Sequence, residues 1–478
     1  MTRYLVENFG CRTSQADGDA IAAQMDGFGA QAARDTTDAD VIVLNTCAVT
    51  SEAERSARAY IRRARRMNPN SRIVVTGCYA QRDPQEIAAM PGVNAVIGNS
   101  HKDHVASIAM EGLANRKPDS FVPLAALEAS LSEHDSHPFL LSGDIFAHSD
   151  FQFPPVPASE AARQNARRTR PTLKIQDGCG NRCTFCIIPS LRGNSRSMPA
   201  QHVVDEVHAF VEAGGKELVL SGINLGRWGR DLTPPDRFES LLADILETTL
   251  LPRIRISSVE PMDWTDGLIS LLARWSTGDH PRLARHVHMP LQSGSDAVLR
   301  RMHRRYRPWH YAERIAKIPA TVPLAAIGAD VMVGFPGETE AEFQESYDFI
   351  AAQPFTYLHL FPFSARPGTP AWEFHRQSPV PSAAVRERMT ALRDLIDRKN
   401  VAFRSNFMGK ILSAVTLIPK ASSPDSNLPR HSMALTDNFL PVELDRMYES
   451  NLLLPVQITG TTPHGLTGAV LRQPNRIA

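Results

Sequence analysis

Six cysteines fall into two sets of three, and both sets have the residue type and spacing of metal ligands. Cys179, Cys183 and Cys186 form a C-x3-C-x2-C array within QDGCGNRCTFCIIP. Thiolates at such spacings bind zinc or iron–sulfur clusters. A structural zinc site needs a fourth ligand, which His202 or His208 would have to supply, whereas a cubane cluster on three cysteines leaves one iron open to another ligand. An inert trio of thiols is the third interpretation, and spacing alone leaves all three open.

The other three cysteines, Cys11, Cys47 and Cys78, are remote from one another in sequence. Each follows directly after an expected β-strand, in RYLVENFG, ADVIVLNT and RIVVTG respectively. Helical patterns separate these strands, and strands alternating with helices predict an open, mostly parallel sheet. Because ligands of such sheets gather at the carboxyl ends of the strands, we expect the three thiols to converge at one edge.

The pattern of strands and helices divides the chain into four parts. Residues 1–116 form the α/β domain just described, and residues 117–170, rich in Pro, Ser and His, are interpreted as a linker. Residues 171–408 hold six more strand candidates separated by helical patterns, which predicts an open, partial (βα)6 barrel closed by a helix over 382–407. Residues 409–478 have short strands and turn residues, which predict a small β-barrel. The expected fold class is therefore α/β with a small all-β domain at the C-terminus.

The composition excludes several classes of protein. The 52 Lys and Arg residues offset 51 Asp and Glu residues, so the net charge of +1 does not by itself indicate a nucleic-acid-binding or a membrane-surface protein, and any electrostatic site must be a local patch. Neither DNA nor a membrane is expected as a partner. No apolar run approaches the length of about 18 residues that spans a membrane, and the N-terminus lacks the apolar region of a signal peptide. Six cysteines in 478 residues are too few for a disulfide scaffold. We expect a cytoplasmic enzyme.

The C-x3-C-x2-C array after a strand, opening a partial barrel, resembles the radical S-adenosylmethionine (SAM) superfamily. In that family the amino and carboxylate groups of SAM chelate the open iron of a [4Fe–4S] cluster, and reduction breaks the C5′–S bond to give a 5′-deoxyadenosyl radical. The resemblance implies SAM contacts in four segments: EAGGKELVLSG, whose glycines and glutamate look like a GGxE-type motif, SSVEP, MPLQSGS and GADVMVGFPGE. The implied contacts are Gly214, Gly215, Glu217, Ser258, Glu260, Gln292 and Gly334.

The N-terminal trio ahead of such a barrel is similar to one branch, the methylthiotransferases, which end in a TRAM domain. NFGCRTSQ, VLNTCAVTSEA and VVTGCYAQ match the three cysteine loops of that branch, with Ser14 standing where these enzymes usually carry Asn. The resemblance implies a second [4Fe–4S] cluster on Cys11, Cys47 and Cys78, which carries the sulfur to be delivered. A second SAM would methylate that sulfur. No catalytic base is implied.

The segments KIQDGCGNRCTFCIIP, GCYAQRDPQEI and LSGINLGRWGRDL most resemble the branch that acts on N6-threonylcarbamoyladenosine at tRNA position 37. The implied reaction replaces the hydrogen on C2 of the base with a methylthio group, and the implied partner is the tRNA anticodon stem-loop. An electron donor and a sulfur donor, both of unknown identity, are also required. Three alternatives stay open: the same chemistry on isopentenyladenosine, the same chemistry on a ribosomal-protein aspartate, and a zinc-stabilised RNA-binding protein without catalysis.

Two cationic stretches suit RNA. A helix expected over SEAERSARAYIRRARRMNP carries an arginine stripe on one face, with Ala57, Ile61 and Ala64 on another. The stripe consists of Arg55, Arg58, Arg62, Arg65 and Arg66. Such a stripe suits phosphate contacts, and a solvated helix face is the alternative. RRMHRRYRPWHY, residues 300–311, mixes cations with aromatic rings that suit stacking on unpaired bases.

Overall fold

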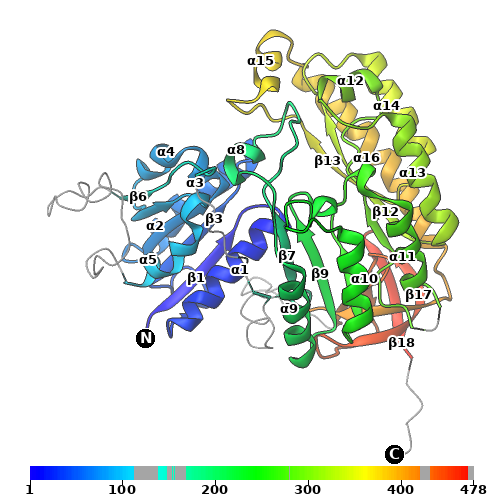
Figure 1. Cartoon of the computed structure of the whole chain (residues 1–478), viewed down its shortest axis with the longest axis horizontal. Coiled ribbons are helices and arrows are strands. Elements are labelled where there is room, and N and C mark those ends of the chain that lie inside the picture. Colours follow the sequence, from blue (N-terminus) through cyan, green and yellow to red (C-terminus); the bar gives the residue numbers. More distant parts are fainter. Residues whose placement is uncertain are drawn as a thin grey trace, which may run out of the picture. The chain divides into compact units, whose positions relative to one another are not determined.

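The computed structural model describes residues 1–111, 138–147, 153, 155–156, 168–278, 280–419 and 431–471 (Figure 1). The chain divides into two compact units. The first comprises residues 1–157, 172–182 and 186–196, and the second comprises residues 158–171, 183–185 and 197–478. Among the described residues, none of the helices combines the length and the apolar composition that a membrane span requires.

A six-stranded, entirely parallel sheet forms the first unit, with the order β2-β1-β3-β4-β5-β6. Its strands are β1 (Arg3–Asn8), β2 (Gln31–Ala32), β3 (Val41–Thr46), β4 (Arg72–Gly77), β5 (Ala95–Ile97) and β6 (Phe139–Leu141). Every residue of β3 is buried, as expected for a central parallel strand. The predicted N-terminal α/β sheet is therefore confirmed. Strand β6 was not predicted, because it consists of three apolar residues within the segment interpreted as a linker, most of which lies outside the described residues.

Helices cover both faces of this sheet. On one face, α1 (Arg12–Gly27) and α5 (Val105–Glu111) pack against Val41 and Val43 of β3. On the other face, α2 (Ser51–Met67), α3 (Cys78–Arg82) and α4 (Pro84–Ala88) pack against Ile42 and Leu44. Successive residues of a strand point to opposite faces, so a single apolar run fills both layers. The first unit also contains η1 (Asn99–His104), β7 (Thr172–Asp177) and α8 (Ile188–Arg192). Its last residue, Arg196, is the first residue of β8 (Arg196–Ser197).

The second unit contains five parallel strands of the predicted partial barrel. β9 (Glu217–Gly222) pairs with β10 (Arg253–Ile256), and β11 (His286–His288), β12 (Ala326–Val333) and β13 (Tyr357–Pro362) form a second parallel sheet. Two parallel bridges, including Ser258 with His288, connect the β10 and β11 segments. Helices alternate with these strands. They are α9 (Ala200–Glu212), η3 (Leu225–Arg227), α10 (Phe238–Thr248), η4 (Pro261–Asp263), α11 (Asp266–Ser276), α12 (Asp296–Arg301), α13 (Pro308–Thr321), α14 (Glu340–Ala352), α15 (Pro370–Gln377) and α16 (Ser382–Ser405).

The C-terminal strands close into a small barrel with the order β14-β15-β16-β18-β17, as predicted. They are β14 (Ile411–Thr416), β15 (Met433–Thr436), β16 (Pro441–Leu444), β17 (Leu453–Thr462) and β18 (Gly465–Val470). Alternate apolar side chains, among them Leu412, Val442 and Val456, fill its core.

Candidate functional site

Cys11, Cys47 and Cys78 follow three neighbouring strands of the first sheet. Cys11 caps α1 just after β1, Cys47 follows β3, and Cys78 follows β4 and begins α3. Parallel strands deliver these residues to the same edge, as predicted. Burial raises the pKa of Cys47 to about 12, and the neighbouring Cys78 and Cys11 add to that rise, which requires the three thiols to lie close together.

The backbone around the trio is shaped for a close approach of thiols. Gly77, just before Cys78, has φ +98°, and a Cβ there would lie 2.3 Å from the carbonyl oxygen of Thr46. Only glycine fits this position. The Val49 N–H lies 3.4 Å from Cys47 Sγ, and Asn99 Nδ2 lies 3.5 Å from Cys78 Sγ. Donors aimed at sulfur favour the thiolate, which is the form that binds metals.

A buried network of charges lies in the same unit. Its members are Asp17, Lys102, Lys174, Asp177 and Arg192. Arg192 Nη2 lies 3.0 Å from Asp17 Oδ2, and Lys174 contacts both carboxylates. Burial raises the pKa of Asp17, but Lys102, Lys174 and Arg192 together hold it well below its ordinary value. Three cations against two carboxylates leave one excess positive charge.

The positively charged guanidinium of Arg192 lies beside the cysteine trio. Its Nη2 lies 3.3 Å from Ser14 Oγ, which in turn lies 3.6 Å from Cys11 Sγ. Burial lowers the pKa of Arg192, but Asp177, Cys78, Asp17 and Cys11 raise it well above its ordinary value. Its Nε is buried and has no hydrogen-bond partner among the described residues. An orphaned cationic donor beside three cysteine side chains fits an anionic iron–sulfur cluster, whose sulfurs accept hydrogen bonds.

The same trio does not fit a preformed zinc site. Sulfurs around tetrahedral zinc, at Zn–S distances of about 2.3 Å, lie about 3.8 Å apart. Within the described ranges, the groups of at least three candidate ligand atoms that all lie within 4.8 Å of one another include no cysteine trio and neither His202 nor His208.

The second cysteine set lies on the loop between β7 and α8. Gly178 precedes Cys179 with φ +71°, and a Cβ there would lie 1.9 Å from the carbonyl oxygen of Asn194. The Cys179 N–H donates to the carbonyl of Gly193 at 3.1 Å, and the Asn181 N–H points at Cys179 Sγ at 3.4 Å. Cys179 and Cys186 are both partly exposed. The loop therefore holds its thiols within reach of a ligand.

Cys183 belongs to the second unit, where a buried arginine contacts it. Arg304 Nη1 donates to Cys183 Sγ at 3.2 Å, and Nη2 donates to Glu260. The next residue, Thr184, is fixed because its N–H and Oγ1 donate to the carbonyls of Met302 and Arg301, at 3.1 and 2.8 Å. Arg304 thus joins a predicted cluster ligand to a predicted SAM contact.

This role of Arg304 has no signature in the sequence, and the whole stretch 300–311 was predicted to suit RNA. That interpretation is wrong for Arg304, Tyr306 and Tyr311, which are buried. Tyr306 donates to the carbonyl of Leu291 at 2.6 Å, and Tyr311 donates to that of Met289 at 2.7 Å. The sequence of these residues does not distinguish a buried position from a surface position, because arginines and aromatic rings occur both in buried hydrogen-bond networks and on RNA-binding surfaces.

Four of the predicted SAM contacts lie at the carboxyl ends of neighbouring strands. Ser258 and Glu260 follow β10, Gln292 follows β11, and Gly334 follows β12. Gln292 is buried at φ +68°, and its Oε1 has no hydrogen-bond partner in the described part of the chain. Ser257 Oγ is buried and lacks a partner in the same way. Such atoms cost about 1–3 kcal/mol each, so their presence at this edge fits a polar ligand such as SAM.

The prediction that Glu217 contacts SAM is wrong. It is the first residue of β9 and pairs with Arg253, so it lies at the opposite end of the strands from Ser258 and Gln292. Its carboxylate is fully buried and contacts Arg255, Arg253 and Arg170 at 2.8, 3.3 and 3.3 Å. Burial raises its pKa, but the three arginines lower it to about 2.

The prediction that Gly214 and Gly215 contact SAM is wrong as well. Their N–H groups donate to the carbonyls of Val211 and Phe210, both at 2.9 Å, and so end helix α9. Gly214 takes φ +77°, as the residue after a helix often does. The string resembles a GGxE motif, but it precedes its strand instead of following it.

Arg255 carries the Glu217 network to the C-terminal barrel. Its Nη2 and Nη1 donate to the carbonyls of Thr436 and Asp437, at 2.9 and 3.1 Å. Arg253 similarly reaches the Ser413 carbonyl at 3.2 Å. Glu217 is therefore a structural residue that fixes two arginines against the barrel.

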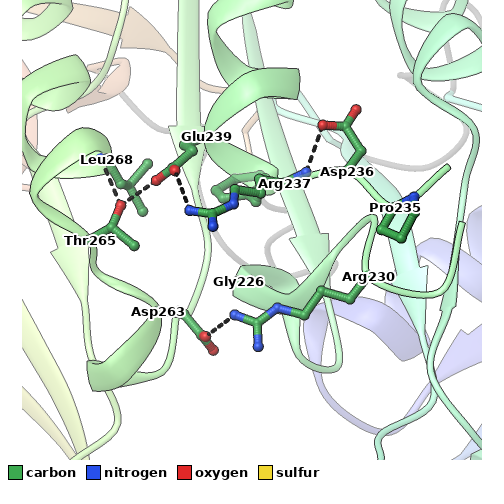
Figure 2. Close-up of a pocket in the computed structure, with 10 residues that line it drawn as sticks. Gly226, Arg230, Pro235, Asp236, Arg237, Glu239, Asp263, Thr265 and Leu268 are labelled. Carbon is green, nitrogen blue, oxygen red and sulfur yellow. Dashed lines mark hydrogen bonds and ion pairs between the residues drawn. The ribbon is translucent and has the colours of Figure 1, made fainter.

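A pocket of about 430 Å³ lies beside η3, η4 and the start of α10. Figure 2 shows two ion pairs among its charged side chains, Arg230 with Asp263 at 2.7 Å and Arg237 with Glu239 at 3.3 Å, and the Arg237 N–H donates to Asp236 at 2.7 Å. Thr265 also donates to Glu239. The residues that line the pocket include no cysteine and no predicted SAM contact, and its charges are satisfied without a ligand.

Comparison with known proteins agrees with this geometry. Residues 3–98 match the model described as "Uncharacterized protein family UPF0004", and residues 173–350 match the radical SAM superfamily model. The two matches contain the two cysteine sets. A chain of Kitasatospora setae, the radical SAM methyltransferase TsrM with cobalamin and a [4Fe–4S] cluster, has a similar fold, with a TM-score of 0.52 and 14% identity over 78% of this chain and 77% of that one.

Curated relatives cover nearly the whole chain. The threonylcarbamoyladenosine tRNA methylthiotransferase MtaB of Bacillus subtilis is 36% identical over 92% of this chain and 90% of the relative. MtaB of Aquifex aeolicus is 33% identical over 95% and 99%. A tRNA-2-methylthio-N(6)-dimethylallyladenosine synthase of Parafrankia sp. is 35% identical over 86% and 77%. The chain belongs to the radical SAM methylthiotransferase family.

Proposed function

We propose that this enzyme replaces the hydrogen on C2 of N6-threonylcarbamoyladenosine, at position 37 of tRNA, with a methylthio group. The observation that carries the proposal is the 36% identity to the Bacillus relative over 90% of its length, because that relative is named for this nucleoside. A tRNA substrate also favours the cytoplasm as the compartment. Membership in a family of enzymes leaves no support for the zinc-stabilised binding protein considered from the sequence.

We further propose that the chain holds two [4Fe–4S] clusters and SAM. The cluster ligands would be Cys11, Cys47 and Cys78 for one, and Cys179, Cys183 and Cys186 for the other. When bound, these groups supply a 5′-deoxyadenosyl radical and a methylated sulfur. The chain's own residues position them: Arg192 donates toward the first site, Arg304 holds Cys183 Sγ, and polar groups at the strand ends receive SAM.

The SAM contacts in this proposal are those at the carboxyl ends of the strands. They are Ser257, Ser258, Glu260, Gln292 and Gly334. Ser257, Gln292 and Gly334 are buried, which limits water at this edge and matters because a carbon radical reacts with whatever it meets first. Glu217 and its preceding glycines have no part in the SAM site.

The tRNA would contact the exposed part of the α2 stripe. Arg62 and Arg66 are exposed, whereas Arg58 donates to Tyr79 Oη at 2.8 Å and Arg65 is held by the carbonyl of Gly92. Arg55, also exposed, pairs with Glu52 at 2.9 Å. Ala57, Ile61 and Ala64 are buried, as predicted for the opposite face. The target adenine must leave its stack for the radical to reach C2.

Nucleoside analysis of tRNA from a deletion strain tests this function. The methylthio form of threonylcarbamoyladenosine should disappear, return with the wild-type gene, and stay absent with Cys47→Ala. Loss of methylthio-dimethylallyladenosine instead would favour the second candidate, to which the 35% identity with the Parafrankia relative points. If the tRNA is unchanged and a ribosomal-protein aspartate has lost its modification, the result would favour the ribosomal protein as the substrate.

A further inference from the structure

Four polar side chains form a continuous chain across one face of the β11-β12-β13 sheet. Ser258 Oγ lies 2.6 Å from His288 Nδ1, His288 Nε2 lies 3.5 Å from Asp330 Oδ1, and His359 Nδ1 lies 3.2 Å from the same oxygen. The register explains the grouping, because His288 pairs with Gly328, two residues before Asp330, and Asp330 pairs with His359. We name Ser258, His288, Asp330 and His359 the polar chain.

The polar chain runs from the interior to an open end. The exposed fraction of the side chain is 6% for His288, 27% for Asp330 and 58% for His359. Because His359 Nδ1 faces Asp330, its Nε2 is the ring atom turned to a ligand. The exposed end therefore offers a carboxylate and an imidazole nitrogen side by side.

This open end lies beside a predicted SAM contact, because the Gln292 N–H donates to the carbonyl of Asp330 at 2.8 Å. Burial raises the pKa of Asp330, but the hydrogen bond from His359 and the charges of His288 and Arg304 lower it below its ordinary value. Asp330 is thus ionised at neutral pH and within electrostatic reach of Arg304, which contacts Cys183 Sγ.

We infer that the polar chain binds the N6 substituent of the target adenosine, with His359 and Asp330 as the direct contacts. This inference rests on the proposed function and deepens it. A threonylcarbamoyl group carries a carboxylate, a hydroxyl and urea N–H groups, which can bond to the imidazole and to the Asp330 carboxylate.

A dimethylallyl group has no polar atom to offer. Placed against His359 and Asp330, it would remove their water without replacing the hydrogen bonds. A site built to hydrogen-bond its substrate discriminates strongly against an analogue that lacks the polar groups. The polar chain would thus separate the two nucleosides for which the relatives are named.

Two anticodon stem-loop RNAs, one with threonylcarbamoyladenosine and one with dimethylallyladenosine, provide the test. Binding is followed by fluorescence anisotropy and product by mass spectrometry, with the reconstituted enzyme. His359→Leu should weaken binding of the threonylcarbamoyl RNA about 10- to 100-fold, as loss of one such hydrogen bond to a charged ligand implies, and leave the dimethylallyl RNA unchanged. His359→Gln keeps a side-chain donor and should recover part of the loss.

His208→Leu is the matched control, because His208 is an exposed histidine on α9. If His359→Leu keeps the wild-type preference between the RNAs while the wild type modifies the threonylcarbamoyl RNA, the inference is overturned and the proposed function stands. If the wild type modifies only the dimethylallyl RNA, the proposed function fails first. If the wild type binds one zinc ion per chain and His359→Leu binds none, the polar chain is a metal site, and this result would also overturn the inference.

Discussion

Arg192 Nη1 donates to both carboxylate oxygens of Asp177, at 3.0 and 3.2 Å, and both side chains are almost completely buried. Asp177 ends β7 and Arg192 ends α8, so this pair closes the loop that carries Cys179 and Cys186. The same guanidinium reaches Asp17 on α1, the helix that Cys11 caps. One side chain therefore ties together segments from both cysteine sets.

Arg192→Leu should lower the free energy of unfolding by about 3–5 kcal/mol, because it removes the hydrogen bonds that a buried guanidinium donates to the buried carboxylates of Asp177 and Asp17. The measurement is anaerobic urea unfolding followed by circular dichroism. Arg55→Leu is the control, since Arg55 and Glu52 are each about 70% exposed and such pairs contribute about 0–1 kcal/mol. Equal losses in the two variants would show that the buried network contributes no more than a surface pair.

Cysteine variants should separate the two halves of the reaction. Cys47→Ala should reduce bound iron from about eight to about four atoms per chain, as loss of one [4Fe–4S] cluster requires, and should still cleave SAM to 5′-deoxyadenosine. Cys183→Ala should lose the same amount of iron and also lose SAM cleavage. Neither variant should yield a methylthio product. Undiminished SAM cleavage by Cys183→Ala would contradict the assignment of the two sites.

The sequence predicted the elements well because burial leaves a strong periodic signal. The strands that precede the N-terminal cysteines, the parallel strands of the barrel, helix α16 and the C-terminal barrel were all expected. Strand β6 was not predicted because a strand of three residues is too short to show an alternating pattern. The error lay in the site assignment: Glu217 was assigned to SAM although it begins its predicted strand, whereas Gln292 follows its own. Because the strands are parallel, the two residues lie at opposite ends of them.

Arg304 and Arg192 illustrate the same limit for side chains. Both follow the cysteine loops in sequence without a distinguishing spacing, and both become informative only when their partners are known. The carboxylate and the sulfur that Arg304 contacts belong to residues 44 and 121 positions away in sequence. Long-range pairings of this kind leave no local signal.

Arg304→Gln should make the cluster on Cys179, Cys183 and Cys186 harder to reduce. A cationic hydrogen bond to a ligand sulfur stabilises the more negative, reduced state, so its loss shifts the midpoint potential to a more negative value. The potential can be measured by electron paramagnetic resonance titration in the Cys47→Ala background, where one cluster remains. Arg305→Gln, an exposed neighbour, serves as control and should leave the potential unchanged. A potential that Arg304→Gln does not shift would contradict a role at the sulfur.

Glu217→Gln should destabilise the chain without weakening SAM binding. The amide leaves three arginines without their carboxylate, which costs about 3–5 kcal/mol for a buried pair. Because the folded pKa of Glu217 is lowered to about 2 from 4.5, its stabilisation is present above about pH 4.5 and disappears as the pH falls towards 2. The difference in urea midpoint between wild type and variant should therefore shrink across that window.

SAM affinity completes the Glu217 experiment and separates structure from binding. Equilibrium dialysis at neutral pH should give the same Kd for wild type and folded Glu217→Gln. Gln292→Leu should raise the Kd by about tenfold or more, because its buried Oε1 is placed where SAM is expected and a hydrogen bond of this kind contributes about 1–3 kcal/mol. The opposite ranking, with affinity lost in Glu217→Gln and kept in Gln292→Leu, would return the SAM site to the amino end of β9 and reverse the correction made from the strand register.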